Sequence, residues 1–196
     1  MSPTSCEVKL LGQKQSLELP LSDATEQQFS FDGTNFVVAA QEAKSDSIHV
    51  TFYALDDNEK WRHTELIVEE YMDLDTTDLW YHYFLVLLVG KTALLGLPLK
   101  DTSTGGPGAG KVYVYEQIGD FNIWEKTGEL LPQDSSPDTY FGCNVKLLNG
   151  YAYVAAFSAK AIYVFRKNEL GQWVQKSNLG LIIRCIFLFL LEMRSF

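Results

Sequence analysis

Residues 140–179 decide the fold, and they read YFGCNVKLLNGYAYVAAFSAKAIYVFRKNELGQWVQKSNL. Four short runs rich in β-branched and aromatic residues are separated by turn signals, the first of which is Asn149-Gly150. Asn-Gly is typical of a two-residue hairpin turn, because both of its residues tolerate a positive φ. Four strands joined in sequence by tight turns make up one blade of a β-propeller. This stretch therefore predicts a four-stranded antiparallel sheet.

The same order of features recurs twice upstream, in residues 29–70 and 78–131. A turn glycine follows the first strand of each unit, at Gly33, Gly90 and Gly150. Small residues end the second strand, at Ala39-Ala40, Gly96 and Ala155-Ala156. A tryptophan opens the fourth strand, at Trp61, Trp124 and Trp173. Features that return in one order indicate stacked copies of one supersecondary unit.

We therefore predict an all-β fold, a partial β-propeller of about three four-stranded antiparallel blades. The units are a degenerate blade at 29–70, a second blade at 78–131 and the best-matching blade at 138–179. Residues 1–28 form an N-terminal segment, such as the outer strand of an adjoining blade, and residues 180–196 form an atypical apolar tail. Three blades leave a ring incomplete, since propellers typically have about 4–8. Sandwiches and barrels share these strand signals and stay open as alternatives.

The pattern also predicts how the blades pack. Small residues on the inner strands let neighbouring sheets approach closely. The third strands, such as residues 112–115 and 162–165, are apolar on both faces, as expected where neighbours cover a sheet on both sides. The recurring tryptophan is expected to cover the outer edge of its blade, with its indole N–H in water.

Residues 124–173 resemble an FG-GAP repeat, the blade type of integrin α-subunit propellers. The likeness rests on Trp124, on Asp134 or Asp138 before Phe141-Gly142, on the turn at Asn149-Gly150 and on the small-residue and aromatic strands that follow. In the second unit Tyr81-His82 occupies the Phe-Gly position, and the first unit has no counterpart. The resemblance implies a non-catalytic binding or interaction module with a protein or glycan partner. It also implies an extracellular or cell-surface setting, although residues 1–11 show no secretory signal pattern.

Integrin-like repeats often carry a calcium loop with alternating acidic residues. The candidates here are Asp73, Asp75 and Asp78, but the third carboxylate comes one place late and no glycine follows. A calcium loop needs several converging oxygens and a glycine for its sharp turn. We therefore expect a solvated acidic segment between blades and no metal or cofactor, with calcium as the alternative.

Residues 105–111, GGPGAGK, fit the core pattern of a phosphate-binding loop. That chemistry also needs Ser or Thr after the lysine and a helix that begins there. Val112 follows instead, within a strand pattern, so a flexible hairpin loop is the better interpretation. The histidines lack metal-ligand spacing, and His49 and His63 are expected to face each other across two strands of one blade.

Charge and hydrophobicity limit the classes of partner that this chain can bind. A net charge of −9 disfavours nucleic acid, because an acidic surface repels phosphates. The apolar run at 179–191 is broken by Arg184 and is shorter than the roughly 20 residues of a membrane-spanning helix. Open sheet edges predict self-association. Two alternatives to a binding module remain: a glycan-active enzyme on a propeller, which needs two carboxylates about 5–10 Å apart in a cleft, and a truncated gene product without independent function.

Overall fold

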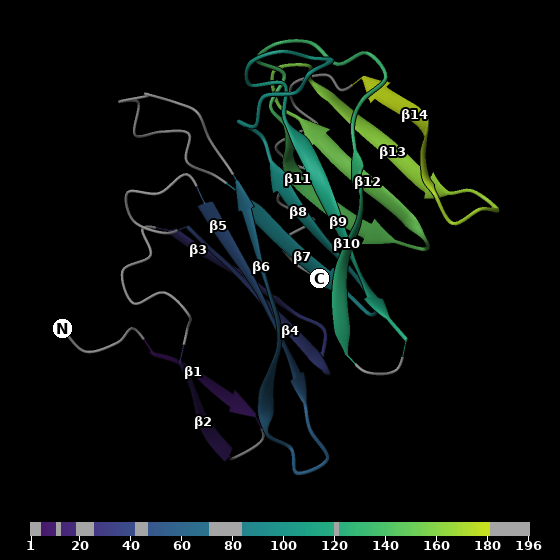
Figure 1. Cartoon of the computed structure of the whole chain (residues 1–196). Coiled ribbons are helices and arrows are strands. Elements are labelled where there is room, and N and C mark those ends of the chain that lie inside the picture. The colour runs from purple at the N-terminus through teal and green to yellow at the C-terminus, as the bar shows by residue number, and fades with distance from the viewer. Residues whose placement is uncertain are drawn as a thin grey trace.

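The computed structural model describes residues 5–10, 13–18, 26–41, 47–70, 84–119 and 122–180. Every regular element in these ranges is a strand, and Figure 1 shows three sheets that follow one another along the chain. The predicted all-β architecture of three four-stranded antiparallel sheets is confirmed, and it matches a partial propeller-like arrangement. Within the described part of the chain, no helix is long and apolar enough to cross a membrane.

Each sheet is a meander in which strands pair with their sequence neighbours. Blade 1 contains β3 (Glu26–Phe31), β4 (Asn35–Gln41), β5 (Ser47–Leu55) and β6 (Trp61–Glu70). Blade 2 contains β7 (Leu85–Val89), β8 (Thr92–Leu97), β9 (Lys111–Ile118) and β10 (Ile123–Leu130). Blade 3 contains β11 (Phe141–Leu148), β12 (Tyr151–Ala156), β13 (Ala161–Lys167) and β14 (Trp173–Gly180). A separate hairpin pairs β1 (Ser5–Leu10) with β2 (Gln13–Glu18).

The first hairpin of each blade turns at the glycine that the repeat pattern marks. In blade 3, Asn149 has φ 52° and Gly150 has φ 76°, so both turn residues lie in the left-handed region. Gly33 has φ 104° and Gly90 has φ 57°. A Cβ at any of the three glycines would meet nothing within 4 Å, so backbone conformation rather than space favours glycine there.

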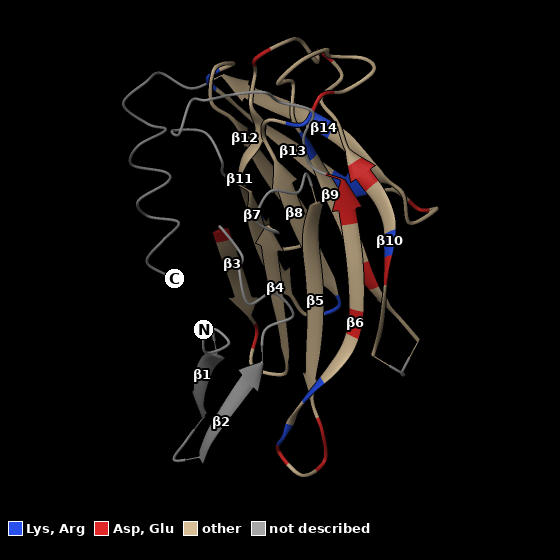
Figure 2. Cartoon of the chain, turned by 60° about the vertical axis from the view of Figure 1, so that its left-hand side comes forward, with Lys and Arg blue, Asp and Glu red and all other residues tan. Residues whose placement is uncertain are grey.

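Two apolar clusters join the blades. The first lies between blades 1 and 2, and the second lies between blades 2 and 3. Blade 2 supplies alternate residues of its middle strands to each: Tyr115 belongs to the first cluster and Val114 to the second. Burial on both faces explains why these strands read as continuous apolar runs. Figure 2 shows charged residues at strand ends, in turns and on outer strands, whereas β4, β5, β7 and β8 carry none.

The tryptophans of blades 2 and 3 pack between blades. The expectation that the recurring tryptophan covers the outer edge with its N–H in water is wrong, because the indole nitrogen is buried in all three blades. Trp124 is 1% exposed, and its ring stacks on Phe52 of blade 1 at 4.5 Å between centroids and 7° between planes. Its Nε1 is buried without a hydrogen-bond acceptor. The apolar area that a buried indole contributes outweighs one unmade hydrogen bond. Trp173 is half-buried against the cluster between blades 2 and 3.

Trp61 occupies the matching place in blade 1. It packs with Phe31 and Phe36 in a third cluster, on the face opposite to the one that meets blade 2. Among the described strands, β6, β10 and β14 are each the last strand of their sheet, so each has one edge without a partner strand. Self-association through such edges stays a prediction.

Glu26, at the start of β3, is expected to make the stability of blade 1 depend on pH. Burial raises the pKa of its carboxyl from 4.5 to about 7, against a hydrogen bond with Gln28 that lowers it. The folded state therefore holds a proton that the unfolded state releases, so the free energy of unfolding should fall as pH rises from 4.5 to about 7. Urea unfolding at pH 5 and pH 8 should show this fall, and Glu26→Gln should reduce it. An equal pH dependence in both proteins would contradict this assignment.

Candidate functional site

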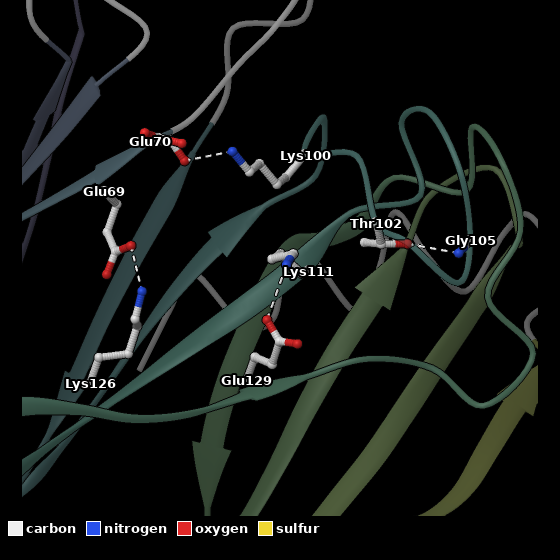
Figure 3. A network of polar contacts seen from close by, with 8 residues as sticks. All are labelled: Glu69, Glu70, Lys100, Thr102, Gly105, Lys111, Lys126 and Glu129. Carbon is white, nitrogen blue, oxygen red and sulfur yellow. Dashed lines mark hydrogen bonds and ion pairs between the residues drawn. The ribbon is translucent and has the colours of Figure 1, made fainter.

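The glycine-rich segment at residues 101–110 is fixed by its own hydrogen bonds. Its glycine amides donate to Thr102 Oγ1 (Gly105, 2.8 Å), Thr102 O (Gly106, 2.8 Å), Asp101 Oδ1 (Gly108, 2.9 Å) and Lys100 O (Gly110, 3.0 Å). Lys111 Nζ pairs with Glu129 Oε2 at 3.0 Å, and Figure 3 shows the two side chains pointing toward each other. Because these donors already have acceptors, the segment does not offer the free amides of a phosphate cradle. It is the loop of the β8–β9 hairpin, as expected, and these hydrogen bonds show that it is packed.

This loop binds the chain that enters blade 3. The amide of Asp138 donates to Pro107 O at 2.9 Å, Tyr140 to Gly108 O at 3.1 Å, and Phe141 to Ala109 O at 3.1 Å. The Thr139 hydroxyl also donates to Ala109 O, at 2.9 Å. We call residues 101–110 and 132–141 together the clamp. It joins the loop ends of blades 2 and 3 into one surface.

Glycines allow the backbones of blades 2 and 3 to approach each other closely at the clamp. A Cβ at Gly110 would lie 2.7 Å from Phe141 N, and a Cβ at Gly142 would lie 2.7 Å from Lys111 O. A Cβ at Gly96 would overlap the carbonyl oxygen of Gly142. Gly142 also has φ 93°, a conformation that other residues rarely adopt. Phe141 is fully buried in the cluster between blades 2 and 3. The Phe-Gly pair is thus the point where blade 3 rests on blade 2.

A buried carboxylate joins blades 1 and 2. Glu69, 5% exposed, accepts a hydrogen bond from Tyr115 Oη at 3.0 Å and pairs with Lys126 Nζ at 2.7 Å. The ammonium of Lys126 also lies 4.2 Å from the ring centroid of Tyr113, a cation–π distance. Figure 3 shows Lys126 reaching Glu69 and, nearby, Lys100 donating to the backbone oxygen of Glu70.

The two tyrosines of this junction stay neutral near pH 7. Burial, together with the charges of Glu69, Glu129 and Glu70, raises the pKa of Tyr113 to about 12. Burial raises the pKa of Tyr115 further, and the charge of Glu69 and the hydrogen bond to it act in the same direction. Tyr115 therefore remains the donor, and both oxygens of Glu69 have partners. The arrangement suits a structural link between two blades.

Glu69 and Lys126 should show measurable coupling. Glu69→Gln is expected to cost about 1.5–3 kcal/mol of unfolding free energy, since a charged hydrogen-bonding group is lost from a buried place. A double-mutant cycle with Lys126→Met, followed by urea unfolding, should give a coupling energy of about 0.5–3 kcal/mol. The pair of Lys111 and Glu129, whose carboxylate is 43% exposed, provides the comparison, with coupling of about 0–1 kcal/mol. Equal coupling in the two pairs would contradict a special role for the buried carboxylate.

A polar depression of about 500 Å³ lies on blade 3 beside the clamp. Four segments line it: the loop before β11, the turn between β12 and β13, the first half of β13, and the end of β14. Its polar side chains include Asp134, Ser136, Asp138, Ser158, Tyr163 and Asn178. Two further depressions among the described residues lie around the turn between β13 and β14, one at residues 166–170 and one between residues 127–129 and 170–174. The blade 3 depression is therefore the candidate site at the loop end.

The depression is held by its own contacts. Asn178 Nδ2 donates to Asp134 Oδ2 at 3.2 Å, and the amide of Ser158 donates to Thr139 O at 3.2 Å. Burial, a hydrogen bond to Asp134 and the charge of that carboxylate raise the pKa of Tyr163 to about 12, so its phenol stays protonated near pH 7. The groups that face a ligand are thus carboxylates, hydroxyls and an amide.

The predicted site residues fall in different places. The anchors Gly33, Gly90, Gly150, Phe141, Gly142, Trp124 and Trp173 lie at turns and blade interfaces, and Trp61 lies in the cluster on the face of blade 1 away from blade 2. The calcium candidates Asp73, Asp75 and Asp78 lie outside the described residues, as do residues 181–196 of the tail. Within the described ranges, no group of three His, Cys, Asp or Glu could hold a metal ion.

The two histidines do not face each other, contrary to expectation. His49 lies opposite Val68, whereas His63 lies opposite Tyr53, with ring centroids 5.8 Å apart. A β-bulge after Phe52 contributes to this register. Sequence reasoning also missed the depression: Asp134 and Asp138 carried a repeat signal, but nothing singled out Ser158 or Asn178.

Comparisons with known proteins show the fold and no more. The chain matches no protein-family model, and no curated protein matches it. A crystal structure of a protein from Lactobacillus plantarum, a structural-genomics target, matches with a TM-score of 0.54 and 10% identity. The match covers 87% of this chain and 46% of that chain, so this chain spans about half the length of its structural neighbour. What the two proteins share is a β-rich, propeller-like arrangement of sheets.

Proposed function

We propose that this protein is a non-catalytic binding module built from FG-GAP-type blades, which contacts a protein or glycan through the loop end of blades 2 and 3. The clamp is the observation that carries the proposal. It fixes the loops of two successive blades against each other through backbone hydrogen bonds of 2.9–3.1 Å. Loops held by a rigid scaffold are where binding residues concentrate. A surface ordered before contact binds with a smaller entropic cost.

The position of Phe141-Gly142 supports the FG-GAP part of the proposal. The pair stands where blade 3 meets blade 2, and the lack of a side chain at Gly142 admits the carbonyl of Lys111. The FG-GAP repeat is named after its Phe-Gly pair, and a close contact between neighbouring blades would explain why such a repeat needs that pair. Glu69 also favours a binding function over a catalytic one. Its oxygens already have Tyr115 and Lys126 as partners, so this buried carboxylate serves as a link between blades.

A glycan-active enzyme is the competing function, because Asp134 and Asp138 line one depression. Long incubation of the full chain with a panel of oligosaccharides, followed by mass spectrometry, distinguishes the two. We expect every oligosaccharide to be recovered with unchanged mass. Shortened or unsaturated products that disappear with Asp134→Asn or Asp138→Asn would overturn the proposal of a non-catalytic module.

A further inference from the structure

We infer that the blade 3 depression binds a neutral saccharide through the carboxylates of Asp134 and Asp138 and the neutral polar groups around them. This inference rests on the proposed binding function and names its ligand class. The depression, about 500 Å³, is large enough for one or two sugar rings, within the usual volume range of small-ligand sites.

The charge of the lining selects against anions. Two carboxylates line the depression, and its described lining residues include no Lys, Arg or His. A phosphate, sulfate or carboxylate ligand would meet like charge without a compensating cation. An apolar ligand would leave the carboxylates and hydroxyls without partners, which costs free energy. The remaining ligand classes are neutral polyhydroxyl compounds and cations.

The mixture of donors and acceptors favours the polyhydroxyl compound. Asp134 already accepts from Asn178 Nδ2 and from the phenol of Tyr163, which reduces its capacity to hold a cation. Ser136 and Ser158 add hydroxyls that can donate or accept. A sugar hydroxyl needs one acceptor and one donor, so carboxylates beside hydroxyls complement a saccharide. An ammonium or guanidinium group would leave the donors of the site unused.

The depression is ordered in advance, and one of its lining residues, Ser158, follows an exposed aromatic residue in the chain. The clamp holds Asp138 and Thr139 through bonds to Pro107 O and Ala109 O. Phe157 precedes Ser158 in the chain and is 62% exposed, although strands β12 and β13 on either side of this turn are largely buried. An exposed aromatic ring offers an apolar face of the kind that packs on the C–H face of a sugar.

A glycan array tests the inference with the full chain as probe. The array carries neutral, sialylated and sulfated glycans, and isothermal titration calorimetry follows any hit. We expect binding to neutral glycans only. Asp138→Asn should weaken it about 10-fold or more, because a hydrogen bond to a charged group is lost. Asp138 has φ 55°, a conformation that Asn also tolerates, so this variant should keep the wild-type melting curve.

Further variants separate a specific site from a general effect of charge. Phe157→Ala should also weaken binding, whereas Asp57→Asn, in an exposed turn of blade 1, should not. Binding that Asp138→Asn and Phe157→Ala leave unchanged would overturn the inference. So would a preference for sulfated glycans, or binding of an oligo-arginine peptide in place of every glycan.

The outcomes also separate this inference from the function on which it rests. If no glycan binds but a protein partner maps to the clamp surface, the saccharide inference fails and the binding module stands. If a neutral glycan binds in the depression and is cleaved there, the site stands and the non-catalytic function fails.

Discussion

Gly96→Ala is expected to be among the most damaging single-atom changes in this chain, with a loss of about 3 kcal/mol or more of unfolding free energy. The new Cβ would overlap the carbonyl oxygen of Gly142 and would lie 3.2 Å from the carbonyl carbon of the same residue. Backbone atoms cannot swing aside as the end of a long side chain can. Blade 3 would have to move away from blade 2, with loss of contacts in the cluster between them.

Gly128→Ala is the matched control for that substitution. Gly128 also lies in a strand of blade 2, has no positive φ, and has nothing within 4 Å of an added Cβ. We expect it to be neutral or to stabilise by about 0.4–1 kcal/mol, because alanine reduces the freedom of the unfolded chain. Urea unfolding of both variants gives the comparison. Similar losses in the two would mean that the close approach of Gly96 to Gly142 is not a constraint.

Trp124→Ala is expected to cost about 3–5 kcal/mol, the range for removing a large buried aromatic side chain. The indole is 1% exposed and stacks on Phe52 of the neighbouring blade, so its removal leaves a cavity between two sheets. Thermal and urea unfolding monitored by circular dichroism measure the loss.

Two control variants, Trp124→Phe and Leu170→Ala, show whether the loss of stability in Trp124→Ala comes from the contact between blades. Phenylalanine keeps a ring beside Phe52 and should restore part of the stability. Leu170 is exposed, and its truncation should change stability by about 0.5 kcal/mol or less. If Trp124→Ala were as mild as Leu170→Ala, the indole would not link the blades.

The sheets could be predicted from sequence because their signals are local. Asn149-Gly150 specifies a hairpin through the φ angles of two adjacent residues, and the alternation around it fixes which strands pair. The order of turn glycine, small residues and tryptophan gave three four-stranded sheets for the same reason. Short-range chemistry and sheet topology agree in these units.

Contacts between blades could not be predicted in this way. The side on which Trp124 lies depends on Phe52, which is 72 positions earlier in the numbering of the chain. Glu69 meets Tyr115 and Lys126 across separations of 46 and 57 residues. The glycines of the loop at 105–110 look like signs of flexibility, because the chain that packs on them is not their sequence neighbour. The depression has irregular loops for most of its lining, where no periodicity exists to detect.

The clamp bears on how this chain folds as it leaves the ribosome. Residues 138–141 dock on residues 107–109, which belong to the preceding blade and are synthesised first. Blade 3 can thus dock on a template that has already left the ribosome, so the order of synthesis suits the order of assembly of these two blades. Repeat proteins grow by such nearest-neighbour additions. Slow translation through residues 142–180 would then cost the nascent protein little, because the acceptor surface is already in place.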